Sequence, residues 1–150
     1  MTEFCRRGFG GDGVRVYNKD MTQVQAVQIW LNGAEEALTT ALILLQSKRY
    51  DHCLFFGQLY LEKLLKALTY HLIDDHPIPT HNLVQLCAKI SISLSEDQKK
   101  ELREISSFNT TARYPEDKSV LYKKATREFA VTWFKKIEEY GNYFKSYLAK

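Results

Sequence analysis

The stretch around Arg113 carries residue types suited to holding a phosphorylated ligand. It reads FNTTARYP over residues 108–115. The guanidinium of Arg113 can contact a phosphate at two points, and the ring of Tyr114 can stack on a base. The amide of Asn109 can donate and accept hydrogen bonds at a base or sugar edge. Because the three residues lie within six positions, the stretch favours a nucleotide-binding role.

Ordinary structural roles explain the same residues too. Arg113 can bond carbonyl groups at the end of a helix, or pair with Glu116 or Asp117. Tyr114 can pack in the core. Since Pro115 biases the residue before it toward an extended backbone, the segment 106–118 is expected to form a loop between helices. The sequence leaves both roles open for Arg113 and Tyr114.

A polar stripe marks a second group of candidates, on an otherwise apolar helix predicted over residues 51–73. The stripe consists of Gln58, Glu62, Lys66 and Thr69, with Lys63 alongside. A helix apolar on nearly all sides is expected to be the central, most buried one. If the stripe faces Arg113, then Lys63 and Lys66 add positive charge for a phosphate or an RNA backbone. The alternative is a solvent-facing strip in which Glu62 and Lys66 form an i,i+4 ion pair.

His81 is the last candidate, in the histidine-containing segment HLIDDHPIPTH. Thr80 is expected to cap the short helix that follows. His81 can contact a nucleotide, help to cap the same helix, or bond the neighbouring loop. The segment also carries other metal-ligand types, but no pair of histidines has the i,i+4 spacing of a helical zinc motif. No metal site is therefore predicted.

The elements that must position these residues are helices. Thr22 and Gln25 predict a capping box at the start of the first one. Helical periodicity then covers roughly residues 23–45, 51–73, 80–90, 95–105 and 118–147. No segment shows the period-two alternation of a strand over a useful length. The predicted fold class is all-α, an antiparallel up-and-down helical bundle of about five helices.

Composition sets the broad class. The chain has 150 residues, 45% hydrophobic and 26% charged, which predicts one soluble domain. Residues 1–20 hold four of the seven glycines and are expected to be a flexible arm, with the bundle over 21–150. A net charge of +3 falls short of a dedicated nucleic-acid binder. Three scattered cysteines predict no disulfide framework and a cytoplasmic location, and no apolar run reaches the roughly 20 residues of a membrane helix.

Three segments together resemble one known family. They are FFGQLYLEKLLKALTYHL (55–72), PIPTHNLVQL (77–86) and FNTTARYP (108–115). In order and spacing they resemble the HEPN family, named for higher eukaryotes and prokaryotes nucleotide binding, over about residues 23–147. The resemblance implies an up-and-down bundle, similar to the helical C-terminal domain of kanamycin nucleotidyltransferase, that forms a homodimer.

The resemblance is compatible with more than one function. Ribonuclease-type members carry an arginine followed after four to six residues by a histidine, and Arg113 has no such histidine. The chain then resembles a module that binds ATP or another nucleotide, without a cofactor, and acts with a separately encoded minimal nucleotidyltransferase. The alternative is a divergent ribonuclease, the toxin component of a toxin-antitoxin pair, in which Arg113 acts on RNA with His81. The missing histidine favours a binding module over an enzyme. A dimeric scaffold without a ligand is the third interpretation.

Overall fold

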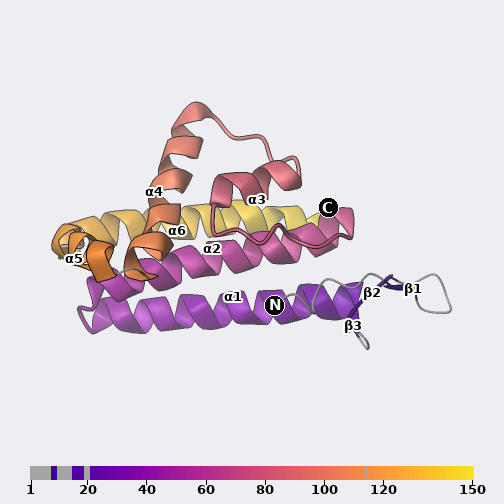
Figure 1. Ribbon diagram of the computed structural model, residues 1–150, viewed down its shortest axis with the longest axis horizontal. Helices are drawn as coiled ribbons and strands as arrows, with labels where there is room; N and C mark the ends of the chain where they lie inside the picture. Colours follow the sequence, from indigo (N-terminus) through magenta and orange to yellow (C-terminus); the bar gives the residue numbers. More distant parts are fainter. Residues whose placement is uncertain (1–7, 10–14, 19–20, 114) are drawn as a thin grey trace.

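The computed structural model describes residues 8–9, 15–18, 21–113 and 115–150, and the side chains of residues 21–109 and 120–150. The all-α bundle is confirmed: the described part contains six helices rather than about five (Figure 1). They are α1 (Gln23–Gln46), α2 (Tyr50–Ile73), α3 (Leu83–Lys89), α4 (Glu96–Arg113), α5 (Pro115–Lys124) and α6 (Arg127–Lys145), with a final 3-10 turn η2 (Ser146–Ala149).

Helices α1, α2 and α6 lie along the long axis of the molecule, while α4 crosses them and rises away from the bundle (Figure 1). α1 runs antiparallel to α2, and α6 runs in the same direction as α2. Two glycines allow α6 to approach α2 closely. A Cβ atom on Gly57 would lie 2.7 Å from Ile137, and one on Gly141 would lie 2.4 Å from the Tyr60 hydroxyl. Larger residues at these positions would force the two helices apart.

The core is centred on α2, as its apolar circumference predicts. The fully buried leucines of this helix are Leu54, Leu61, Leu64, Leu65 and Leu68. α1 differs, because its buried residues are all alanines: Ala26, Ala34, Ala37 and Ala41. Its outer face leaves several aliphatic side chains exposed. No helix in the described ranges combines the length and the apolar character that a membrane crossing requires.

The structure corrects the expected loop over residues 106–118. α4 continues to Arg113, and α5 begins at Pro115. Packing explains the continuation. In the helical conformation Phe108 and Asn109 both lie in the core, where neither has any exposed surface. A proline at the first position of a helix is favourable, since its missing N–H would have no intrahelical partner there.

The expected last helix, 118–147, is divided in two. α5 ends at Lys124, and Thr126 caps α6 by accepting a hydrogen bond from the backbone N–H of Phe129 at 3.2 Å. A threonine at an N-cap satisfies an N–H group that the helix itself leaves unpaired. The division accounts for the sixth helix.

A small antiparallel sheet precedes α1 (Figure 1). Its strands are β1 (Gly8–Phe9), β2 (Arg15–Asn18) and β3 (Met21–Thr22). These strands of two to four residues are too short to show the period-two alternation of a strand in the sequence. The other positions of residues 1–20 lie outside the described residues, so the flexible arm stays a prediction. The capping box of Thr22 and Gln25 at the start of α1 is confirmed.

Candidate functional site: a buried polar network that ends at His81

The carboxylate of Glu62 is the centre of a polar network inside the bundle. Glu62 is only 3% exposed, yet both of its oxygens have partners. Lys66 Nζ donates to Oε1 at 2.8 Å, and Gln58 Nε2 donates to Oε2 at 3.0 Å. His81 Nδ1 lies 3.0 Å from Oε2 and 3.2 Å from Oε1. A buried carboxylate with this many donors is fully compensated.

The spacing of the stripe on α2 explains the first part of the network. Gln58, Glu62 and Lys66 are four residues apart and therefore occupy one face of the helix. The predicted ion pair between Glu62 and Lys66 is present. The solvent-facing interpretation of the stripe was wrong, because the two side chains are only 4% and 7% exposed. Since α2 is covered on nearly all sides, its polar face is turned toward other elements instead of solvent.

Gln58 connects α2 to two other segments. Its Nε2 also donates to the backbone carbonyl of His81 at 3.0 Å, and its Oε1 accepts from Asn109 Nδ2 on α4 at 2.8 Å. Gln58 and Asn109 have no exposed surface. Nearby, Ser106 Oγ accepts from the backbone N–H of Leu83 at 3.0 Å. These bonds fix α4 and the start of α3 against the polar face of α2.

His81 is the solvent end of the network. Its side chain is 42% exposed, in contrast to the buried Glu62 that contacts it. The ring donates from Nδ1 to the carboxylate, either as the Nδ1–H tautomer or as the protonated ring. Nε2 makes no hydrogen bond within the described part of the chain, so this nitrogen is the one open to a ligand.

His81 does not cap α3, and neither does Thr80, which was expected to do so. Asn82 is the N-cap, and its side-chain oxygen accepts from the backbone N–H of Val84 at 3.0 Å. Thr80 Oγ1 instead accepts from the backbone N–H of Asn82 at 3.1 Å. The turn therefore fixes the backbone on both sides of His81 and leaves its ring for Glu62.

Electrostatics favour the charged form of Glu62. Burial alone would raise its pKa, but the hydrogen bond and the positive charge of Lys66, together with hydrogen bonds from Gln58 and His81, hold the pKa below its ordinary value. Lys66 Nζ also lies 5.3 Å from the ring centre of Trp30 on α1, a cation–π contact. The network thus presents an imidazole to solvent and keeps a fixed carboxylate behind it.

The predicted site residues fall into three groups. Lys66, Asn109 and His81 belong to one network, but only His81 reaches solvent, while the other two are buried and already hydrogen-bonded. Lys63 lies against α1, where a Cβ on Gly33 would be 3.2 Å from its Cδ.

Arg113 and Tyr114 form the third group. Arg113 is the last residue of α4, four positions after Asn109, and its side chain lies outside the described residues. Tyr114 lies wholly outside them.

The sequence analysis did not predict the central role of two residues in the network. Gln58 and Glu62 were recognised in the stripe but were not expected to organise the site. The available signal was a polar row on a helix otherwise too apolar to face water, since buried polar groups must find partners. The role of Ser106 has no sequence signal, because it depends on how α4 meets α3. Among the described side chains, no group of three or more His, Cys, Asp or Glu is arranged to hold a metal ion.

Comparison with known proteins identifies the family. The family model described as HEPN domain matches residues 27–146. The crystal structure of TT1696 from Thermus thermophilus superimposes with a TM-score of 0.68 at 21% identity, covering 81% of this chain and 98% of that one. At this identity the likeness shows the fold alone. None of the curated proteins matches the chain. Because the family model spans most of its length, the chain belongs to the HEPN domain family.

Proposed function

We propose that the protein is a nucleotide-binding module that acts with a separately encoded minimal nucleotidyltransferase. The observation that carries the proposal is the exposed ring of His81, oriented by a buried carboxylate. Family membership supports a HEPN module. In this proposal a ligand would bind at the solvent end of the network, where His81 is exposed.

The network would contribute little free energy to folding if its role were only structural. Desolvating the charges of Glu62 and Lys66 consumes much of what their attraction provides, and well-packed apolar residues often stabilise a core equally well. A buried, fully bonded network does hold an exposed group in one orientation. In this proposal Lys66 and Asn109 position the site rather than contact the ligand. His81 contacts the ligand directly.

The remaining contacts come from the end of α4. Arg113 would hold a phosphate of the nucleotide and Tyr114 would stack on its base. Lys63 would contribute positive charge from α2. The ligand class is ATP or another nucleotide, with no further cofactor. The chain would act in the cytoplasm as a homodimer and would form a helical wall beside the active site of the nucleotidyltransferase.

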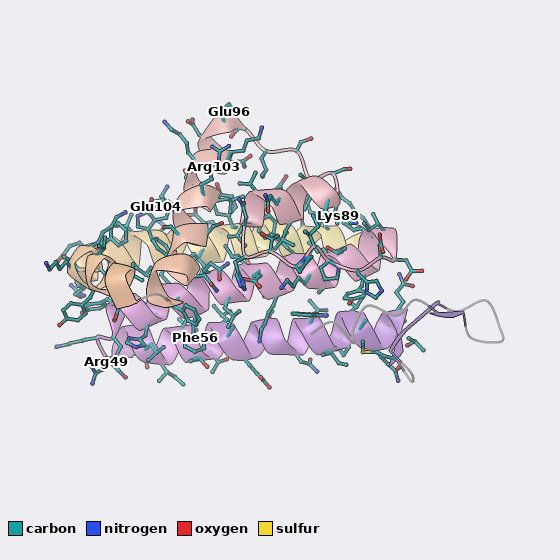
Figure 2. The ribbon with its side chains drawn as sticks, in the orientation of Figure 1. Arg49, Phe56, Lys89, Glu96, Arg103 and Glu104 are labelled. Atoms are coloured by element: carbon teal, nitrogen blue, oxygen red, sulfur yellow. The ribbon has the colours of Figure 1, made fainter. Side chains whose placement is uncertain are left out.

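Titration of the full chain with ATP, followed by isothermal calorimetry and amide NMR, tests the proposal. Because a hydrogen bond to a charged group contributes about 1.5–3 kcal/mol, we expect Arg113→Ala and His81→Ala each to weaken binding by roughly tenfold or more. Arg103→Ala is the matched control, since Arg103 is an exposed arginine of the same helix (Figure 2). If ATP moves neither the melting temperature nor any amide signal of the wild type, the scaffold interpretation replaces this one.

A divergent ribonuclease is the second candidate, and one contact favours it. Gln58 bridges the backbone of His81 to Asn109, one turn before Arg113 on α4. His81 would take the proton of a ribose 2′-hydroxyl as its oxygen attacks phosphorus, and Arg113 would bind the phosphate. A 2′,3′-cyclic phosphate would form as the bond from phosphorus to the 5′-oxygen breaks, and the 5′-oxygen would take up a proton from water. Such an enzyme would be the toxin component of a toxin-antitoxin pair.

Incubation with end-labelled RNA separates the two candidates. A binding module leaves the RNA intact. Cleavage by the wild type that is lost in both Arg113→Ala and His81→Ala, and retained in Arg103→Ala, would establish the ribonuclease instead.

A further inference from the structure

A second feature lies at the end of the bundle where α1 turns into α2 and α6 begins. The surface there contains a hollow with a volume of about 340 Å³. The lining residues are Leu45, Gln46, Lys48, Tyr50, Arg127 and Val131. None of them belongs to the network of Glu62. Figure 2 labels Arg49 at this turn.

The hollow is cationic. Lys48 and Arg127 are exposed, and neither forms an ion pair with any described side chain. None of the lining residues is acidic. Two acidic residues are next to lining residues in the sequence. Oδ1 of Asp51, which follows Tyr50, lies 3.0 Å from Nδ1 of His52, and Glu128 follows Arg127 in the first turn of α6. Two cations without acidic partners beside one hollow are available to a negatively charged group from outside.

The backbone of the turn holds one of these cations in a conformation unusual for its residue type. Lys48 has a φ of 60°, in the left-handed region that most side chains avoid. The backbone N–H of Arg49 bonds the carbonyl of Leu44, and that of Lys48 bonds the carbonyl of Leu45. This pattern closes a helix C-terminus, and glycine is its commonest residue at the position of Lys48. A lysine there places a charge beside the hollow.

Apolar surface continues from the hollow along α1. Val131 in the lining is 47% exposed. One turn before Leu45 and Gln46, the side chains of Leu42 and Ile43 are 39% and 56% exposed. Exposed aliphatic residues that adjoin a hollow mark a contact surface more often than isolated ones do.

We propose that this hollow docks an acidic peptide segment of a protein partner. A large apolar side chain of the peptide fills the hollow, and its carboxylates pair with Lys48 and Arg127. A peptide fits better than a nucleotide, because the aliphatic surface of Leu42 and Ile43 extends beyond the hollow itself. An apolar anchor surrounded by polar contacts is the usual organisation of a protein interface. The hollow shares no lining residue with the proposed nucleotide site, and its ligand is of a different class.

Selection of a random peptide library displayed on phage against the full chain tests this proposal. We expect the enriched peptides to combine Asp or Glu with a large apolar residue. Measured by fluorescence anisotropy, one such synthetic peptide should bind at least about tenfold more weakly to Arg127→Glu and to Lys48→Glu. Lys100→Glu, on the exposed part of α4, is the charge-matched control and should bind as the wild type does.

A second pair of variants tests the apolar part. Leu42→Ser should weaken the same peptide, whereas Val24→Ser, in an exposed position at the other end of α1, should not. The proposal is overturned if the selection enriches no acidic peptides, or if the selected peptides bind both charge-reversed variants normally. It is also overturned if ATP or single-stranded RNA displaces the peptide, or if Arg127→Glu dissociates a dimer in light scattering. Those last results would assign the hollow to a nucleotide or to a second copy of the chain.

Discussion

The network on α2 and the hollow at the α1–α2 turn use the same residue type in opposite ways. Lys66 is 7% exposed and lies 2.8 Å from a carboxylate, whereas Lys48 is exposed and has no ion-pair partner among the described residues. A buried charge must be compensated when the chain folds. An exposed one stays hydrated and remains available to a ligand. Position in the bundle therefore decides whether a lysine is held by a carboxylate or stays exposed to solvent.

The largest effect should come from breaking the buried pair. Glu62→Gln leaves Lys66 buried without a counter-charge and should lower the free energy of unfolding by about 3–5 kcal/mol. Urea unfolding followed by circular dichroism measures this loss. The double variant Glu62→Gln/Lys66→Met should lose clearly less than the sum of the two single changes. Additive losses would contradict the pairing seen in the structure.

A smaller loss is expected at the α4 end of the network. Asn109→Ala removes the donor to Gln58 and leaves a buried amide oxygen without that partner, at a cost of about 1–3 kcal/mol. Asn32 provides the control, because it accepts a side-chain hydrogen bond from Gln28 at 2.8 Å but is exposed. Asn32→Ala should change stability by less than about 0.5 kcal/mol. Equal losses of unfolding free energy in the two variants would contradict the expectation that the buried hydrogen bond contributes more than the exposed one.

Acid should act on the network through Glu62. Because its pKa is lowered in the folded protein, the carboxylate stabilises the fold above its ordinary pKa, and this contribution is lost as the pH falls through the lower, folded value. Urea unfolding from pH 7 down through about pH 4 and below should therefore show a steeper loss of stability in the wild type than in Glu62→Gln. Parallel curves would show that Glu62 titrates alike in the folded and unfolded states.

The smallest effect on stability is expected at the hollow. Arg127→Ala and Lys48→Ala remove exposed cations without ion-pair partners among the described side chains, so thermal unfolding should detect changes within about 0.5 kcal/mol. The exposed pair of Lys99 and Glu96, at 3.2 Å, sets the scale, since such pairs contribute about 0–1 kcal/mol. A loss well above that range would indicate that the cations already serve the fold.

Much of the fold followed from local patterns. The burial of α2, the capping box at Thr22 and the all-α class depend on periodicity and on short-range hydrogen bonds, which neighbouring residues determine. The site was predictable only in part. Lys66, Asn109 and His81 were chosen for their chemistry, and the structure joins them in one network. Their division into buried and exposed members depends on contacts between distant segments.

The sequence by itself determined that the chain is helical and that one helix carries polar residues at four-residue intervals. Only the tertiary structure decided that this row faces inward, because whether a helix face meets solvent depends on which other helices cover it. The same reason explains why α4 continues through Asn109 toward Arg113, where the proline alone suggested a loop. Local sequence preference favours an end to the helix before Pro115. The burial of Phe108 and the hydrogen bond from Asn109 to Gln58 stabilise the helical conformation up to that point.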